Sequence, residues 1–223
     1  MEKRKILFGT YDTARDGLWT LTGWTFPTPE RYTNIVEVPG RKKGPLDLST
    51  VLTDGEPVYL NRQLTATFES SEGTRMEREN RIETMVNWLD GWSMNIMLPD
   101  DSDHYIVGRV SVSKEYNDKA HAAVIVTATC EPWRYSVAER IRTLAAATSE
   151  QVAVLTNSGR LTVSPVIEIT GDGAMVNLVF GAASWSLGPG AYQLPDLILK
   201  QGDARLTYSG AGTVKITYRE AVL

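Results

Sequence analysis

Apolar and polar residues alternate through most of the chain, and this alternation predicts a mainly β protein. From Val58 to Phe68 nearly every second residue is apolar, with Arg62 as the exception. A period of two places these side chains on one face of an extended strand, against a core. The same pattern predicts strands over residues 18–22, 34–38, 105–113, 122–130, 164–170, 204–208 and 213–219. Turns rich in glycine are expected at 53–57, 157–159, 171–173, 188–190, 201–203 and 209–212.

Residues 74–90 carry a helical pattern instead. Thr74 and Glu77 have the spacing of a capping box, and Gly91 provides a stop signal. Glu77 and Arg81, four residues apart, are expected to form an ion pair. An apolar stripe favours packing on a sheet over binding of a cofactor. Its members are Ile82, Met85, Val86 and Leu89, with Trp88 and Trp92 at the margin.

Residues 136–148 fit two different structures. Ser136 and Glu139 offer a second capping box, and the alanines that follow favour a helix. Alternating residues such as Val137 and Ile141 fit a strand equally well. The residues themselves leave both alternatives open.

The sequence CEPWRYS, residues 130–136, indicates a domain boundary. Pro132 has no N–H group to give to a central strand, and from about Glu139 onward strands and glycine turns prevail. A chain of 223 residues has room for two β domains with separate cores. We expect a first domain over residues 1–135, which includes the helix, and a second over 136–223.

Composition and charge exclude several classes of protein. Hydrophobic residues make up 42% of the chain and charged residues 22%, as in ordinary globular proteins. The net charge of −4 gives no general basic field for nucleic acid or an anionic membrane. The apolar run at residues 6–8 is too short for a signal peptide, and no stretch approaches a membrane span. Cys130, the single cysteine, shares one face of a predicted strand with apolar residues, which favours a buried structural thiol.

Candidate chemistry is sparse. His104 and His121 lie on different segments, and no further ligands at zinc spacing accompany them. The acidic cluster Asp100, Asp101 and Asp103 could contact calcium, but a polar turn explains it better. The basic run at Arg41, Lys42 and Lys43 could contact phosphate, but an exposed loop between two strands is favoured. We therefore expect that the chain is not an enzyme and that it binds no cofactor and no metal.

Two other hypotheses can be stated from the residues. The chain could be a carbohydrate-binding module, in which Trp185, the single tryptophan of the second domain, stacks on a sugar. It could also be a hydrolase that uses two carboxylates such as Asp103 and Glu115, which must then lie within about 5–10 Å of each other.

The order of several short motifs resembles the distal tail protein (Dit) family of phages with long, flexible, non-contractile tails. The most specific motif runs from Leu98 to Val110, and PWRY follows Cys130. NSGRLTVSP at 157–165 and YRE at 218–220 support it. The resemblance covers nearly the whole chain. The positions that mark it are Pro99, Tyr105, Gly108, Arg109, Pro132, Trp133 and Tyr135.

The resemblance implies an N-terminal β-sandwich-like domain with one packed α-helix and a small C-terminal galectin-like β-sandwich. It also implies that the segment DDSDHY is a turn and that residues 139–146 form a strand. The second domain is short compared with that of larger family members, so inserted arms or carbohydrate-binding modules are not expected.

The implied function is structural. Family members form a six-membered ring, alone or as a stacked pair of rings, around a channel through which DNA passes without specific binding. The ring joins the tail tube protein to the tail-tip (Tal-like) protein, and in some phages it carries receptor-binding proteins. The residues 41–43 are the candidate subunit-contact loop. The expected location is the distal end of the virion tail, with assembly in the host cytoplasm and no membrane insertion.

Overall fold

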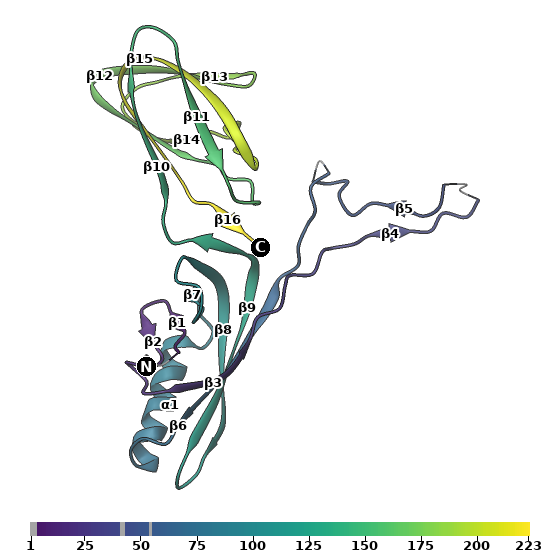
Figure 1. Ribbon diagram of the computed structural model, residues 1–223, viewed down its shortest axis with the longest axis vertical. Coiled ribbons are helices and arrows are strands. Elements are labelled where there is room, and N and C mark those ends of the chain that lie inside the picture. Colours follow the sequence, from purple (N-terminus) through teal and green to yellow (C-terminus); the bar gives the residue numbers. More distant parts are fainter. Residues whose placement is uncertain (1–3, 41–42, 54) are drawn as a thin grey trace. The chain divides into compact units, whose positions relative to one another are not determined.

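The computed structural model describes residues 4–40, 43–53 and 55–223, and these form two compact units (Figure 1). The first unit contains the described residues up to Arg134, together with Leu223. The second contains Tyr135–Val222. Each unit has its own core of buried apolar side chains.

An antiparallel sheet forms the first unit, with strands in the order β2-β1-β7-β8-β9-β6-β3. Their bounds are β1 Leu7–Phe8, β2 Tyr11–Asp12, β3 Thr20–Thr25, β6 Arg62–Ser70, β7 Ser93–Met97, β8 His104–Asn117 and β9 Ala122–Ser136. Strands β6 and β9 pair from Arg62 opposite Cys130 to Ser70 opposite Ala122. Leu64, Ala66 and Phe68 are buried on one face of β6, as their alternation predicted.

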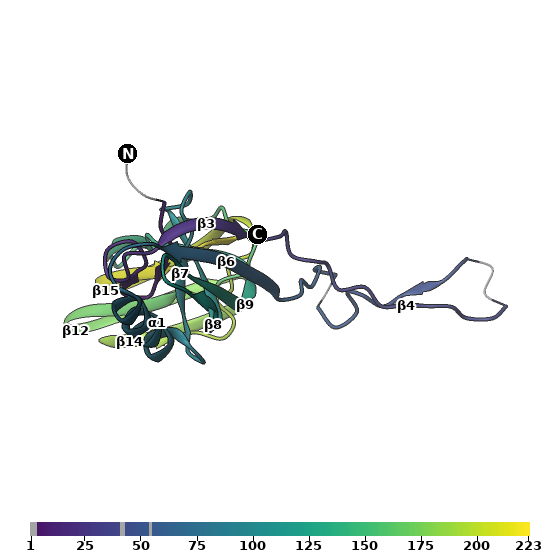
Figure 2. The ribbon, with the colours of Figure 1, turned by 90° about the horizontal axis from the view of Figure 1, so that it is seen from below.

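Helix α1 (Arg75–Leu89) packs over one face of this sheet (Figures 1 and 2). The capping box is confirmed, because Thr74 accepts from the Glu77 N–H and the Glu77 carboxylate accepts from the Thr74 N–H. Ile82, Met85 and Leu89 are buried in the core, and Val86 packs against it. Trp88 and Trp92 are exposed, and Trp92 lies beyond the end of the helix.

Two arginines of the helix behave differently from the sequence prediction. The expected Glu77–Arg81 pair does not form, because the Glu77 carboxylate is used by Thr74 and Arg81 donates to Ser70 Oγ and to the Glu72 carbonyl. Arg78 is 1% exposed, and its guanidinium donates to the carbonyls of Gly73, Asp118 and Lys119. It therefore ties the start of the helix to the β8–β9 turn.

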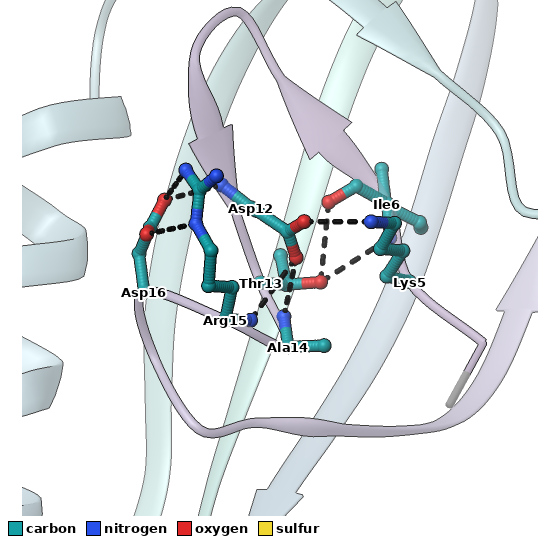
Figure 3. Close-up of polar contacts among 7 residues, drawn as sticks. All are labelled: Lys5, Ile6, Asp12, Thr13, Ala14, Arg15 and Asp16. Carbon is teal, nitrogen blue, oxygen red and sulfur yellow. Dashed lines mark hydrogen bonds and ion pairs between the residues drawn. The ribbon is translucent and has the colours of Figure 1, made fainter. Parts of the chain in front are cut away.

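The N-terminal strands are held by a compact set of polar contacts (Figure 3). Asp12 pairs with Lys5 at 2.8 Å and accepts from the N–H groups of Ala14 and Arg15. Burial raises the pKa of Asp12, but Lys5 and the two N–H groups outweigh it and hold the pKa below its ordinary value. The Thr13 hydroxyl donates to the Ile6 carbonyl. These contacts fix the turn that brings Ile6 and Trp19 into the core.

Strands β12 (Val166–Phe180) and β15 (Gly202–Tyr218) form the centre of the second unit. One edge of β15 pairs with β10 (Arg140–Ala146) and β11 (Gln151–Asn157). The opposite edge of β12 pairs with β13 (Ala183–Leu187) and β14 (Gly190–Gln193), and β16 (Ala221–Val222) follows β15. The β12–β15 pair is divided by a register shift between Thr170 and Met175, and the paired residues on both sides of the shift contribute side chains to one core. The sheet therefore curls into a sandwich-like arrangement. Examples are Ile167, Ile169, Val214 and Ile216 from one half and Val176, Leu178 and Leu206 from the other.

The strand predicted over residues 139–146 is confirmed as β10, which begins at Arg140. The turns predicted at 171–173 and 209–212 are wrong, because β12 and β15 continue through them. The register of the pair shifts between Thr170 and Met175, as at a β-bulge. Glycines with positive φ bend the two strands here instead of reversing the chain.

Gly210 tests this account of the bend. Its φ is +122°, and a Cβ there would lie 2.1 Å from the Met175 carbonyl oxygen. We expect Gly210→Ala to lower the free energy of unfolding by about 3 kcal/mol, from backbone strain and overpacking together. Chemical denaturation measures the loss.

Gly181→Ala is the matched control. Gly181 also has a positive φ, +60°, but a Cβ there meets nothing within 4 Å. Only the backbone penalty of about 1–2 kcal/mol remains. Equal losses in the two variants would contradict the close approach at Gly210.

Candidate functional site

A long arm leaves the sheet of the first unit between β3 and β6 (Figures 1 and 2). Near its root the two segments bridge at Arg31 and Tyr59, and the Tyr32 N–H donates to the Val58 carbonyl. Further out, β4 (Ile35–Val36) pairs with β5 (Leu46–Asp47). The arm is therefore a thin two-stranded ribbon.

The arm exposes apolar side chains along its length. Leu52 is 98% exposed and Ile35 is 61% exposed. Others along the arm are Tyr32, Val36, Val38, Val51 and Leu60. An isolated two-stranded ribbon is marginally stable in water, and exposed apolar patches mark sites of protein interaction. The arm has the composition of a contact element.

The root of the arm is held by side chains of the sheet. The Arg62 guanidinium lies 3.9 Å from the centre of the Phe26 ring and donates to the Pro27 carbonyl. Burial, with a smaller contribution from the charge of Arg134, lowers the pKa of Arg62 to about 10. Tyr59 meets the Trp133 ring edge to face, with ring centres 5.7 Å apart. Arg62, the exception in the strand pattern, is the residue that anchors the arm.

Only part of the candidate contact loop at residues 41–43, which lies between β4 and β5 in the sequence, falls within the described residues. Arg41 and Lys42 lie outside the described residues. Lys43 is described and exposed.

The segment DDSDHY forms a turn that leads into β8, which already includes His104 and Tyr105. Asp101 is the residue of the acidic cluster with a clear set of partners. Its carboxylate contacts His104 Nδ1 at 2.8 Å and the Arg134 guanidinium at 3.0 Å. Arg134 also donates to the carbonyl of Leu223. Asp101 thus connects this turn to the end of β9, a role that local sequence did not reveal.

The positions that carried the resemblance are distributed over this region. A Cβ on Gly108 would lie 2.6 Å from Cys130 Sγ, so the glycine permits β8 and β9 to approach. Arg109 donates to the Gly91 carbonyl, where the helix ends. Pro132 is buried within β9, so the strand does not stop there as we expected. Pro99 lies in the turn, Trp133 at the arm root, and half-buried Tyr135 begins the second unit.

The structure separates the two carboxylates that the hydrolase hypothesis requires to be close together. Asp103 precedes β8 and Glu115 lies near its far end, so at the rise of a strand the two are about 40 Å apart. The two-carboxylate hydrolase is therefore ruled out for this pair. Residues 4–40, 43–53 and 55–223 contain no group of three or more His, Cys, Asp or Glu placed to hold a metal. Trp185 packs against the core of the second unit, which disfavours its use as a sugar platform.

Comparison with solved structures shows a likeness over nearly the whole chain. The chain superimposes on the crystal structure of SPP1 Dit (gp 19.1) with a TM-score of 0.68 over 96% of this chain and 98% of that one. It has the Dit fold. The sequence identity is 14%, so the likeness lies in the fold. SPP1 Dit is described as a paradigm of the hub adsorption apparatus in phages that infect Gram-positive bacteria.

Sequence comparisons found no such similarity. No protein-family model matches the chain, and no curated protein matches it. The Dit-like fold predicted from the order of the motifs is confirmed by the structure. In the described part of the chain, no helix is long and apolar enough to cross a membrane.

Asp101 provides a test of the polar network. We expect Asp101→Ala to lower the free energy of unfolding by about 1–3 kcal/mol, because hydrogen bonds to charged partners are lost. Asp103→Ala, an exposed position in the same turn, should change it by less than about 0.5 kcal/mol. Equal effects would contradict the assigned role of Asp101.

The difference in free energy of unfolding between the wild type and Asp101→Ala should depend on pH, because the Asp101 carboxyl group titrates. Partial burial raises the pKa of Asp101, but His104 and Arg134 outweigh it, so the pKa lies below its ordinary value. The stabilisation is present above the unfolded pKa, near 4, and is lost as the pH falls through the lower folded pKa. The Asp101→Ala difference should therefore disappear in strong acid, as denaturation at several pH values would show.

Cys130 provides a second test. The thiol is buried, and burial raises its pKa to about 11. A thiol reagent such as DTNB at pH 8 should therefore leave the native protein unmodified and modify the denatured chain once, at its single cysteine. Rapid modification of the native protein would contradict this burial.

Proposed function

We propose that this chain is a ring-forming hub at the distal end of a phage tail. The observation that carries the proposal is the Dit fold over 96% of the chain. In this role the ring joins the tail tube to the tail-tip protein and surrounds the channel for DNA. The chain has no catalytic part in the process and needs no cofactor.

The first unit forms the ring, and its arm supplies the contact between neighbouring subunits. A ring requires a head-to-tail interface, in which one surface of a subunit binds a different surface of the next. An arm that extends from its own sheet can reach such a surface. Burial of apolar side chains such as Leu52 and Ile35 stabilises the contact, at about 25 cal/mol for each Å² removed from water.

Residues 41–43, between β4 and β5 in the sequence, add charge to this contact. Arg41, Lys42 and Lys43 bring three positive charges to a chain with a net charge of −4. Acidic residues on the neighbouring subunit would attract these three side chains and set the orientation in which the arm docks. We assign residues 41–43 to the subunit contact on this basis.

The channel and the second unit complete the proposal. A chain with a net charge of −4 offers no general basic field, so DNA passes without specific binding. The second unit is the galectin-like sandwich and lies outside the ring wall, where receptor-binding proteins attach in phages that carry them. The hub is assembled in the host cytoplasm and remains in the virion.

Light scattering over a concentration series tests the ring. We expect a mass of six or twelve times 24.7 kDa, with a central hole in negative-stain images. The double variant Ile35→Asp, Leu52→Asp should shift the mass to that of the monomer, because two charges cannot be buried in an apolar contact.

The double variant Val152→Asp, Met175→Asp is the matched control. Both side chains are exposed and apolar, but they belong to the second unit. It should keep the mass of the wild type. A wild-type monomer at every concentration, or an arm variant that assembles normally, would contradict the proposal.

A further inference from the structure

A pocket of about 340 Å³ opens at one edge of the second unit, between β10, β11 and the end of β15. Its polar lining comes from Arg140, Arg142, Thr156, Ser158 and Tyr218, and Ile141 and Val154 supply apolar walls. Arg140 and Arg142 alternate along β10, opposite Tyr218 and Ile216 of β15. The strand register therefore places both guanidinium groups on the same face.

The hydrogen-bond acceptors around this pocket are already in use. Glu220 accepts from Arg140 Nε at 3.2 Å with one oxygen and from the Ser158 N–H at 2.8 Å with the other. The Thr156 carbonyl accepts from the Tyr218 hydroxyl at 2.7 Å. The Thr156 hydroxyl donates to Asp203. The same contacts occupy the Tyr218 and Thr156 hydroxyl groups, the Ser158 N–H and Arg140 Nε, so the donors that remain come mainly from the guanidinium of Arg142 and the terminal nitrogens of Arg140.

Arg142 has no acidic partner within the described part of the chain, although other basic residues of this unit do. Arg219 pairs with Glu139, Lys215 with Glu168, and Arg140 with Glu220. The unit as a whole carries seven basic and seven acidic residues, so the positive charge at the pocket is local. An unpaired guanidinium beside a partly neutralised one matches a planar or tetrahedral oxyanion, which arginine binds through two parallel hydrogen bonds.

The other groups in the pocket suit the same ligand. Burial and Glu220 raise the pKa of Tyr218, although Arg140 and Arg142 oppose them, so the phenol is neutral near pH 7 and brings no repelling charge. The volume lies at the lower end of the range for small-molecule sites. Val154 lines the same pocket and supplies an apolar contact for the carbon skeleton of such a ligand.

We propose that this pocket, the β10–β11 pocket, binds a phosphate or carboxylate group carried on a ligand of monosaccharide size. Arg142 supplies the main contact to the oxyanion, and Arg140 supports it with the donors that Glu220 does not use. The site does not depend on ring formation, so its test is separate from that of the hub.

Isothermal titration of the full chain tests the site with glucose 6-phosphate, glucuronate and glucose. We expect at least one of the two anionic sugars to bind and glucose not to bind. The comparison of phosphate with carboxylate identifies which oxyanion the pocket prefers. Absence of binding by both anionic sugars up to about 10 mM, or equal binding of glucose, would overturn the proposal.

Two variants of Arg142 and one control sharpen the test. Arg142→Gln should weaken binding about tenfold or more, as expected for loss of a charge-assisted contact, and Arg142→Lys should weaken it less. Lys215→Gln removes one positive charge from the neighbouring strand β15. Ile216 lies across from Arg142 and shares its face of the sheet, so Lys215, the residue before it, lies on the opposite face. This variant should leave binding within about twofold. Equal weakening by Arg142→Gln and Lys215→Gln would show non-specific attraction and overturn the assignment.

Discussion

The continuity of strand β9 is the constraint on which the rest of the first unit depends. Its first nine residues, from Ala122 to Cys130, pair with β6 and bury a face of the core. The strand then continues past the last β6 pair, so Pro132 lies where β6 requires no N–H from it. Trp133 and Arg134 follow, and they hold the arm root and the Asp101 turn. One hydrogen-bonded strand thus positions the core, the arm and the passage to the second unit.

Much of the fold could be predicted because it depends on local patterns. The capping box at Thr74 and Glu77 and the alternation in β6 are decided by neighbouring residues. The predictions of turns at 171–173 and 209–212 were wrong. A glycine in the sequence indicates that the backbone can adopt a positive φ, but not whether the chain reverses or a strand bends at that position. Whether Gly210 reverses the chain or bends it depends on Met175, which lies 35 positions earlier and pairs only in the folded sheet. That information is absent from any local window.

Buried arginines show that local sequence patterns are also insufficient to predict the candidate site. Arg62 interrupts an apolar alternation and was predicted only as an exception to it, and Arg78 precedes the predicted helical stripe and carried no sign of burial. In the structure their charges are stabilised by distant groups, the Phe26 ring for Arg62 and the carbonyls of the β8–β9 turn for Arg78. A buried charge requires such partners. The arm root and the helix start are therefore fixed by long-range polar contacts, which alternation alone does not encode.

A sequence identity of 14% with a shared fold over nearly the whole chain means that individual contacts are replaceable and geometric requirements are not. Gly108 illustrates the point, because the space it leaves is filled by the sulfur of Cys130, and another pair of matching volumes would serve equally. An arm differs from a core in this respect. In the proposed ring its exposed apolar residues, such as Leu52 and Ile35, contact the neighbouring subunit, so their identities must match that surface rather than a neighbour in the chain. Substitutions in the arm should therefore leave the fold intact and impair the proposed assembly, while substitutions at Gly108 or Cys130 should destabilise the fold itself.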